Sequence, residues 1–203
     1  MTNMTKYLYF YDFLFGSSRR LNNIVRFNTR HRSLSENVAS HSYYVALYSL
    51  ILSKILIQLG EKVNVEKVLT RALLHDIEEC VAGDVLKNVK ADPEMKKAYN
   101  KIAELSAKSV LSPLPPGIKN SLFSEWRHQL EGTEGWIVDM ADELSGITYS
   151  REQLQMGNNY FKTIFADYQK RFRDLVENTI LQDLGTTLVS QEVIQKESYE
   201  KDR

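Results

Sequence analysis

The chain of 203 residues has a single cysteine, Cys80, and so has no disulfide framework. One thiol also excludes a thiolate cluster around a metal, which leaves histidine and carboxylates as the available ligands. Neither sign of charge is in excess, because the chain has 26 basic and 26 acidic residues. Without a basic surplus, neither duplex nucleic acid nor an anionic membrane is expected as the main partner.

Long apolar runs are missing as well. No stretch reaches the length needed to cross a bilayer, and no signal peptide is apparent. Together with the lone thiol, these features predict a protein of the reducing cytoplasm. A hydrophobic share of 43% suits one globular domain. We assign residues 1–190 to that domain and the charged end, 191–203, to a frayed tail.

Strand signals are scarce, and helical periodicity runs through almost the whole chain, which predicts an all-α fold. Ser33 or Ser35 should cap a long helix that runs to about Leu59, where Gly60 ends it. A shorter helix should follow the prolines after residue 112 and reach about Leu130. The other helices are expected at 6–15, 19–27, 64–81, 92–111, 134–156 and 160–177.

An ionisable pair, His75 and Asp76, ends an apolar run. Burying such a pair is costly unless its charge is compensated, and a metal ion would compensate it. Two ligands alone bind weakly, so other helices must contribute. His41 lies on the inward stripe of the preceding helix. A last carboxylate should come from Asp142 or Asp139, and periodicity does not decide between them.

In this order the residues resemble the H…HD…D pattern of HD-domain metal-dependent phosphohydrolases. The flanking segments ENVASHS at 36–42, HDIEECVAGD at 75–84 and ADELS at 141–145 are similar to one branch, the YfbR-like 5′-deoxynucleotidases. The resemblance spans about Arg19 to Gly157 and implies an HD-domain helical bundle. It also implies one divalent ion, for which Mn, Co, Fe, Ni or Zn is suitable. The ligands it implies are His41, His75, Asp76 and Asp142.

Once an ion is granted at this point, the positions of other residues predict roles around it. Glu79 would orient the attacking water and take its proton. Asp84 would contact the sugar hydroxyl or the leaving oxygen. The guanidinium of Arg26 would bind phosphate oxygens in a bidentate manner. Phe27, which stands where the family commonly has Trp, would form a wall for the sugar.

The expected activity is release of phosphate from deoxynucleoside 5′-monophosphates. A rival with the same site would release triphosphate from a deoxynucleoside triphosphate, with Lys87, Lys90 and residues 30–32 extending a phosphate track. A third hypothesis is an HD module that binds a nucleotide or metal without turnover, although the retained Glu79 argues against it. Family members are usually dimers or larger, so a homo-oligomer is implied.

Overall fold

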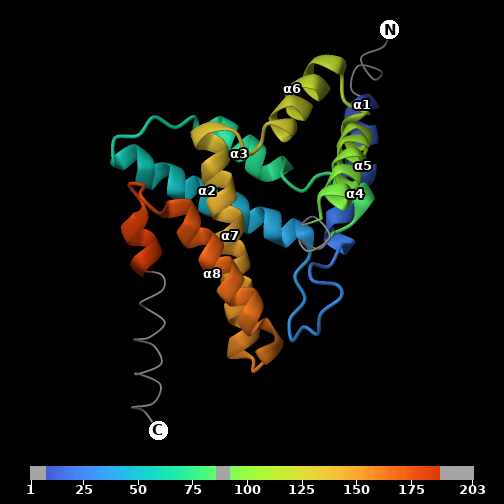
Figure 1. Ribbon diagram of the computed structural model, residues 1–203. Helices are drawn as coiled ribbons and strands as arrows, with labels where there is room; N and C mark the ends of the chain where they lie inside the picture. Colours follow the sequence, from blue (N-terminus) through green and yellow to red (C-terminus); the bar gives the residue numbers. More distant parts are fainter. Residues whose placement is uncertain (1–7, 86–91, 188–203) are drawn as a thin grey trace.

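The computed structural model describes residues 8–85 and 92–187 (Figure 1). These residues are mainly helical and form no strand; one antiparallel bridge joins Val25 to Asn37. The all-α prediction is therefore confirmed. The elements are α1 (Leu8–Leu14), the 3-10 helix η2 (Ser17–Asn23), α2 (Val38–Gln58), α3 (Val65–Leu74), α4 (Glu79–Ala82), α5 (Pro93–Leu111), α6 (Pro116–Arg127), α7 (Gly132–Gln155), the 3-10 helix η4 (Asn159–Phe161) and α8 (Lys162–Val176).

Helices α2 and α7 form the centre of the molecule. α7 contacts α2, α3 and α8, and Figure 1 shows α8 running alongside α7 while α2 crosses it. Burial of a large aliphatic or aromatic side chain contributes about 1.5–3 kcal/mol, so the shared core holds this crossing in place. The main core includes Val45, Leu52, Leu56, Val68, Ile137, Met140 and Phe172.

A second apolar cluster joins η2, α4, α5 and α6. It contains Val38, Ile77, Cys80, Ala107 and Trp126. Val38 begins α2, and Ile77 lies in the turn between α3 and α4. The two apolar clusters therefore meet at the segments that carry the predicted histidine ligands.

The predicted helix at 19–27 is wrong. The chain forms the short η2 and then extends, so that Val25 pairs with Asn37. The amide of Arg26 donates to the carbonyl of Glu36 at 3.0 Å, which joins the two extended segments. Backbone bonds to a distant segment thus replace those that a helix would have formed.

The long helix α2 begins later than predicted, and neither Ser33 nor Ser35 caps it. The side chain of Asn37 accepts a hydrogen bond from the amide of Ser40 at 2.8 Å and is the cap. The end of the helix is as predicted. Gly60 follows it with a φ of 95°, a left-handed conformation that suits glycine.

The predicted helix at 64–81 is broken in the middle. α3 ends before His75, and α4 starts at Glu79. The turn between them uses hydrogen bonds that span three residues, such as the Glu79 amide to the Asp76 carbonyl at 3.0 Å. Residues 77–80 are all buried. Neighbours on a regular helix point about 100° apart, so a helix with one side in solvent would not bury four in a row.

The later helices follow the sequence more closely. Asp92 caps α5 as predicted, and its carboxylate accepts from two backbone amides at 3.0 Å. α6 ends at Arg127, three residues before the expected end, and α7 matches the helix expected at 134–156. The helix expected at 160–177 is α8 preceded by the short η4.

Within the described part of the chain, no helix has the length and apolar character required to cross a membrane. Lys87 and Lys90 lie outside the described residues, and so does the tail expected at 191–203.

Candidate metal centre and substrate site

The predicted His-Asp pair lies where α3 ends. His75 is buried, and its Nδ1 lies 2.7 Å from the carbonyl oxygen of Ala72. Because a carbonyl can only accept, Nδ1 carries a proton, and Nε2 is the ring nitrogen on the inward side that could bind an ion. Asp76 follows directly, with Oδ2 3.1 Å from His75 Nε2.

His41 reaches the same point from the first turn of α2. The side chain is almost completely buried, and its Nδ1 lies 2.9 Å from the hydroxyl of Ser145. Its Nε2 lies 3.2 Å from Nε2 of His75 and 3.5 Å from Oδ2 of Asp76. Both imidazoles therefore direct Nε2 to the same point, while a hydrogen bond within the protein orients each ring through Nδ1.

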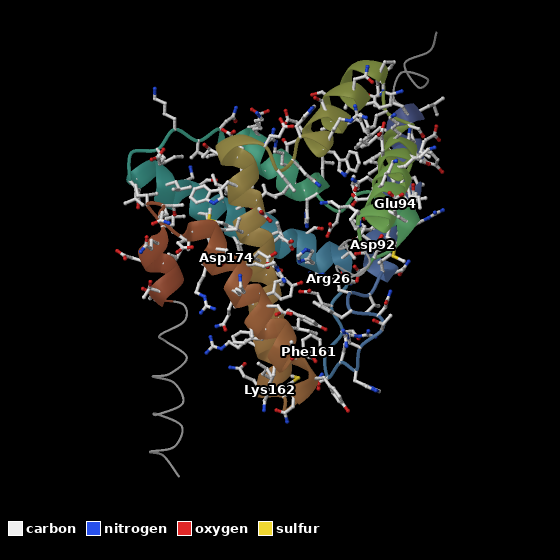
Figure 2. All side chains as sticks on the ribbon, viewed as in Figure 1. Arg26, Asp92, Glu94, Phe161, Lys162 and Asp174 are labelled. Carbon is white, nitrogen blue, oxygen red and sulfur yellow. The ribbon has the colours of Figure 1, made fainter. Side chains whose placement is uncertain are left out.

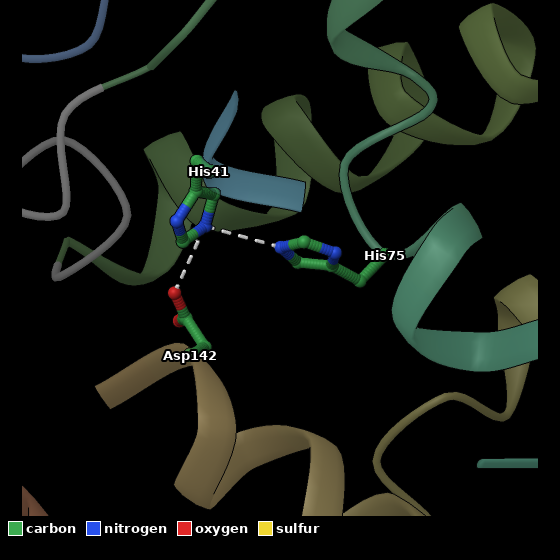
Figure 3. A group of neighbouring side chains, drawn as sticks. All are labelled: His41, His75 and Asp142. Carbon is green, nitrogen blue, oxygen red and sulfur yellow. Dashed lines mark hydrogen bonds and ion pairs between the residues drawn. The ribbon is translucent and has the colours of Figure 1, made fainter. Parts of the chain in front are cut away.

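Helix α7 supplies the fourth side chain. Asp142 Oδ1 lies 3.2 Å from His41 Nε2, and Figure 3 shows this carboxylate and the two imidazoles pointing toward one another. Together, His41, His75 and Asp142 offer donor atoms within 4.8 Å of one another. Asp139, the alternative carboxylate, lines the cavity beside this cluster. Of the two acids, Asp142 is the one that the structure brings to the histidines.

The charges of these groups fit a divalent cation. Burial and the nearby guanidinium of Arg26 lower the pKa of His41 to about 4, so its ring is neutral. Burial opposes ionisation of Asp76, but the ring of His75 holds the pKa of that carboxyl well below its usual range. Burial also opposes charge on His75, yet Asp76 raises its pKa to about 9. A divalent cation bound by two imidazole nitrogens and two carboxylates would replace that proton.

A cavity of about 650 Å³ opens beside the cluster, between α5, α6 and α7. Glu78 lines this cavity together with His75, Asp76 and Asp142. Its buried carboxylate accepts hydrogen bonds from Trp126 Nε1 at 2.9 Å and from the Tyr99 hydroxyl at 3.2 Å. No role was predicted for Glu78. The available signal was a second acid directly before Glu79 in the HDIEECVAGD segment.

Glu79, the predicted proton acceptor, begins α4 and is buried. It lines a second cavity, of about 420 Å³, next to η2, whereas Glu78 lines the larger one. Its amide bonds to the Asp76 carbonyl, so it lies within one turn of the ligand cluster. The role of its carboxylate in proton transfer stays a prediction.

Arg26 is buried near the start of α2, where Figure 2 labels it. Its Nη1 lies 2.6 Å from Oε2 of Glu36, so the predicted phosphate-binding guanidinium is already held by a carboxylate. Its positive charge still acts on the cluster, because it lowers the pKa of His41. Glu36 lies in the ENVASHS segment, but its pairing with Arg26 was not predicted.

Phe27 and Asp84 are joined to each other. Phe27 has a left-handed φ of 53°, and its amide donates to Oδ2 of Asp84 at 3.1 Å. The Phe27 ring stacks on Tyr149, with centroids 5.5 Å apart, and meets Phe161 edge-on at 5.4 Å. The hydrogen bond holds the two predicted sugar-binding residues next to each other. The ring of Phe27 belongs to an aromatic cluster with residues of the α7–α8 hairpin.

Known relatives cover most of the chain. The family model for YfbR-like 5′-deoxynucleotidases matches residues 13–186. A 5′-deoxynucleotidase of Photorhabdus laumondii is 30% identical over 165 residues, which are 79% of this chain and 83% of that protein. The 4′-phosphooxetanocin A phosphatase of Priestia megaterium is 29% identical over 161 residues, 78% of this chain and 80% of that protein.

Solved structures share the fold. An HD-domain phosphohydrolase from Listeria innocua has a TM-score of 0.69 and 22% identity, over 88% of this chain and 97% of that chain. A protein from Pyrococcus horikoshii has a TM-score of 0.70 and 21% identity, over 84% and 94%. These similarities confirm the HD-domain fold. Since the family model spans nearly the whole described chain, the protein belongs to the YfbR-like 5′-deoxynucleotidase family.

Proposed function

We propose that this enzyme is a metal-dependent 5′-deoxynucleotidase that releases phosphate from deoxynucleoside 5′-monophosphates. The main support is the convergence of His41, His75, Asp76 and Asp142, from three segments of the chain, on one point. Two relatives named for a 5′-deoxynucleotidase and a phosphatase activity support a phosphate ester as the substrate.

The four side chains are the proposed ligands of one divalent ion. When bound, such an ion lowers the pKa of a coordinated water toward neutrality and offsets charge on the phosphate. The hydroxyl of Ser145 and the carbonyl of Ala72 orient the two imidazoles. Partners of this kind fix the ring that binds the ion and increase its basicity.

Glu79 is assigned the proton transfer. The oxygen of a water attacks phosphorus, a proton passes from that water to a carboxylate oxygen of Glu79, and the bond from phosphorus to the sugar O5′ breaks. O5′ takes a proton from solvent as it leaves, and Glu79 then returns its own proton to solvent. Asp84, held by the amide of Phe27, is the residue proposed to contact O5′ or the sugar hydroxyl.

Arg26 is proposed to provide positive charge for the phosphate, with Glu36 holding its guanidinium in place. Phe27 is proposed to contact the sugar. Lys87 and Lys90 are proposed to add positive electrostatic potential at the site. A reducing cytoplasmic setting is also part of the proposal, supported by the free, buried thiol of Cys80.

Incubation with dAMP, AMP or dATP, each with a series of divalent metals, followed by chromatography of the products, tests the activity. We expect inorganic phosphate from dAMP. Triphosphate from dATP without phosphate from dAMP would identify the rival triphosphohydrolase. Unchanged nucleotide with every metal would identify a module that binds without turnover.

Glu79→Gln should retain bound metal and lose about 10²–10⁴-fold in turnover, because the amide cannot take the proton. Asp76→Ala should lose turnover and bound metal together. Elemental analysis and initial rates measure both properties. Glu66→Gln, an exposed change on α3, is the matched control and should behave as wild type. Full turnover by Glu79→Gln would refute the assigned role.

A further inference from the structure

A long loop, residues 24–37, connects η2 to α2 and carries two of the proposed substrate contacts, Arg26 and Phe27. We call this loop the strap. It is the blue loop near the lower end of the α7–α8 hairpin in Figure 1. Loops longer than about 12 residues are often functional. The strap contains neither proline nor glycine, so its own sequence does little to fix its conformation.

The backbone of Phe27 shows that other parts of the fold hold the strap in place. Its φ of 53° lies in the left-handed region, which is unfavourable for a bulky side chain. Its amide donates to Asp84 at 3.1 Å, and its carbonyl accepts from Nη1 of Arg32. A residue in such a conformation persists only when the surrounding structure holds it there. The strap therefore needs contacts with the rest of the fold to keep this shape.

The end of α7 provides such contacts through the buried side chain of Gln153. Its Oε1 accepts from the amide of Ser33 at 2.8 Å, and its Nε2 donates to the carbonyl of Leu34 at 2.8 Å. Asn158, which follows α7, donates through Nδ2 to the same Oε1 at 3.0 Å and to the carbonyl of His31 at 2.9 Å. One buried amide therefore holds the strap with both its donor and its acceptor.

This restraint reaches Arg26 through a nearby residue of the strap, Glu36. The carbonyl of Glu36 accepts from the amide of Arg26 at 3.0 Å, and its Oε2 lies 2.6 Å from Nη1 of Arg26. A main-chain bond and a side-chain bond thus join Arg26 to the part of the strap that Gln153 holds. A shift of residues 33–36 would move the guanidinium with them.

The same helix, α7, carries a metal ligand and the residues that hold the strap. Tyr149 donates to the carbonyl of Leu34 at 2.7 Å and stacks on the ring of Phe27. At 1.5 Å per residue, Gln153 lies about 16 Å along the helix from Asp142. One helix therefore fixes the strap relative to the metal centre. Four of its residues recur at intervals of three, four and four and so share one side of it: Asp142, Ser145, Tyr149 and Gln153.

We propose that Gln153 is a positioning residue that fixes the strap, and with it Arg26 and Phe27, at a set distance from the metal ligands. The inference rests on the proposed function, which gives Arg26 and Phe27 their roles in binding the nucleotide. Gln153 acts through Ser33 and Leu34 and does not itself contact the nucleotide. Its loss should therefore weaken nucleotide binding and leave the bound metal unchanged.

Calorimetric titration of dAMP into the metal-loaded Glu79→Gln protein tests the proposal, because this background should bind the nucleotide without turning it over. Adding Gln153→Met keeps the length of the side chain and removes its hydrogen bonds, so the Kd for dAMP should rise at least about tenfold. Gln153→Glu keeps acceptor oxygens for Ser33 and should recover part of the affinity. Gln155→Met, the same change at an exposed position of α7, is the matched control and should bind as the background does.

Hydrogen exchange followed by mass spectrometry shows whether the strap itself is released. Peptides from residues 24–37 should exchange faster in Gln153→Met than in the wild type, while peptides from α3 and α5 should not change. Elemental analysis should find the same metal content in both proteins. Gln155→Met should match the wild type in both measurements.

Three outcomes overturn the proposal. One is an unchanged affinity for dAMP in Gln153→Met. Another is a strap that exchanges as slowly as in the wild type. The third is faster exchange throughout the chain together with loss of metal, which would indicate general unfolding. A Glu79→Gln background that binds no dAMP would instead refute the proposed substrate, and the exchange measurement would still show whether Gln153 holds the strap.

Discussion

The orientation of two imidazole rings determines whether this site can bind an ion. His75 is oriented by the carbonyl of Ala72, three residues away, so its geometry is local. His41 is oriented by Ser145, which is 104 residues away and reaches it only because α2 crosses α7. The sequence predicts both histidines from their positions. The partner of His41 depends on the helix crossing and cannot be predicted from spacing.

At the residue scale, the buried carboxylate of Glu78 has a measurable effect on stability. Glu78→Ala would leave the buried indole N–H of Trp126 without its acceptor, at a cost of about 1–3 kcal/mol. Glu78→Gln retains an acceptor oxygen and should cost clearly less. Urea unfolding of the two variants measures the difference.

A control for this prediction removes a donor together with the acceptor. In a Glu78→Ala, Trp126→Phe double variant, the indole N–H no longer lacks a partner, so the two changes should cost less than the sum of their separate effects. Strictly additive costs would contradict the hydrogen-bonded arrangement.

The single cysteine also gives a prediction at this scale. Burial raises the pKa of the Cys80 thiol to about 11. At pH 8 roughly one thiol in a thousand would then be ionised, and the thiolate is the form that reacts. Alkylation by iodoacetamide at pH 8, followed by mass spectrometry, should be slow in the folded chain and fast in urea. Equal rates would contradict this burial.

At the scale of elements, the sequence predicts helices better than it predicts their ends. Asp92 and Gly60 act through local hydrogen bonds and conformation, and both were placed correctly. The start of α2 was misplaced because Asn37 also pairs with Val25, a contact made across a loop. The break after α3 was missed because the helical spacing continues through His75 to Glu79, and residues 77–80 contain neither proline nor glycine.

The packing of α8 on α7 provides a test at this scale. Gly146 lies where an added Cβ would overlap the ring of Tyr168, which is itself buried. Gly146→Ala should therefore destabilise the fold by about 1–3 kcal/mol, because the ring must shift within a packed core. Urea unfolding measures the change.

The matched control is Gly117→Ala, in the first turn of α6. No atom lies within 4 Å of the Cβ that this change would add. Stability should stay the same or rise by up to about 1 kcal/mol, since alanine favours the helix. A larger loss at Gly117 than at Gly146 would count against the described α7–α8 packing.

At the scale of the whole molecule, composition and periodicity were enough to predict an all-α chain, and the ordered motifs were enough to predict its family. They did not predict that two apolar clusters meet at the site, because this depends on how α2, α4 and α5 are arranged in space. They did place His41 on the inward side of its helix, where the structure buries it.

The spacing of the proposed ligands along the chain has a further consequence. His41 and His75 are 34 residues apart in sequence, yet their Nε2 atoms lie 3.2 Å apart. An ion bound by both histidines and by Asp142 of α7 would act as a removable cross-link that closes long loops of the polypeptide. Bringing the ends of such loops together carries an entropic cost that a bound ion offsets. A chelator would then abolish the activity and also lower the melting temperature. The melting temperature would therefore report the fraction of chains that hold an ion.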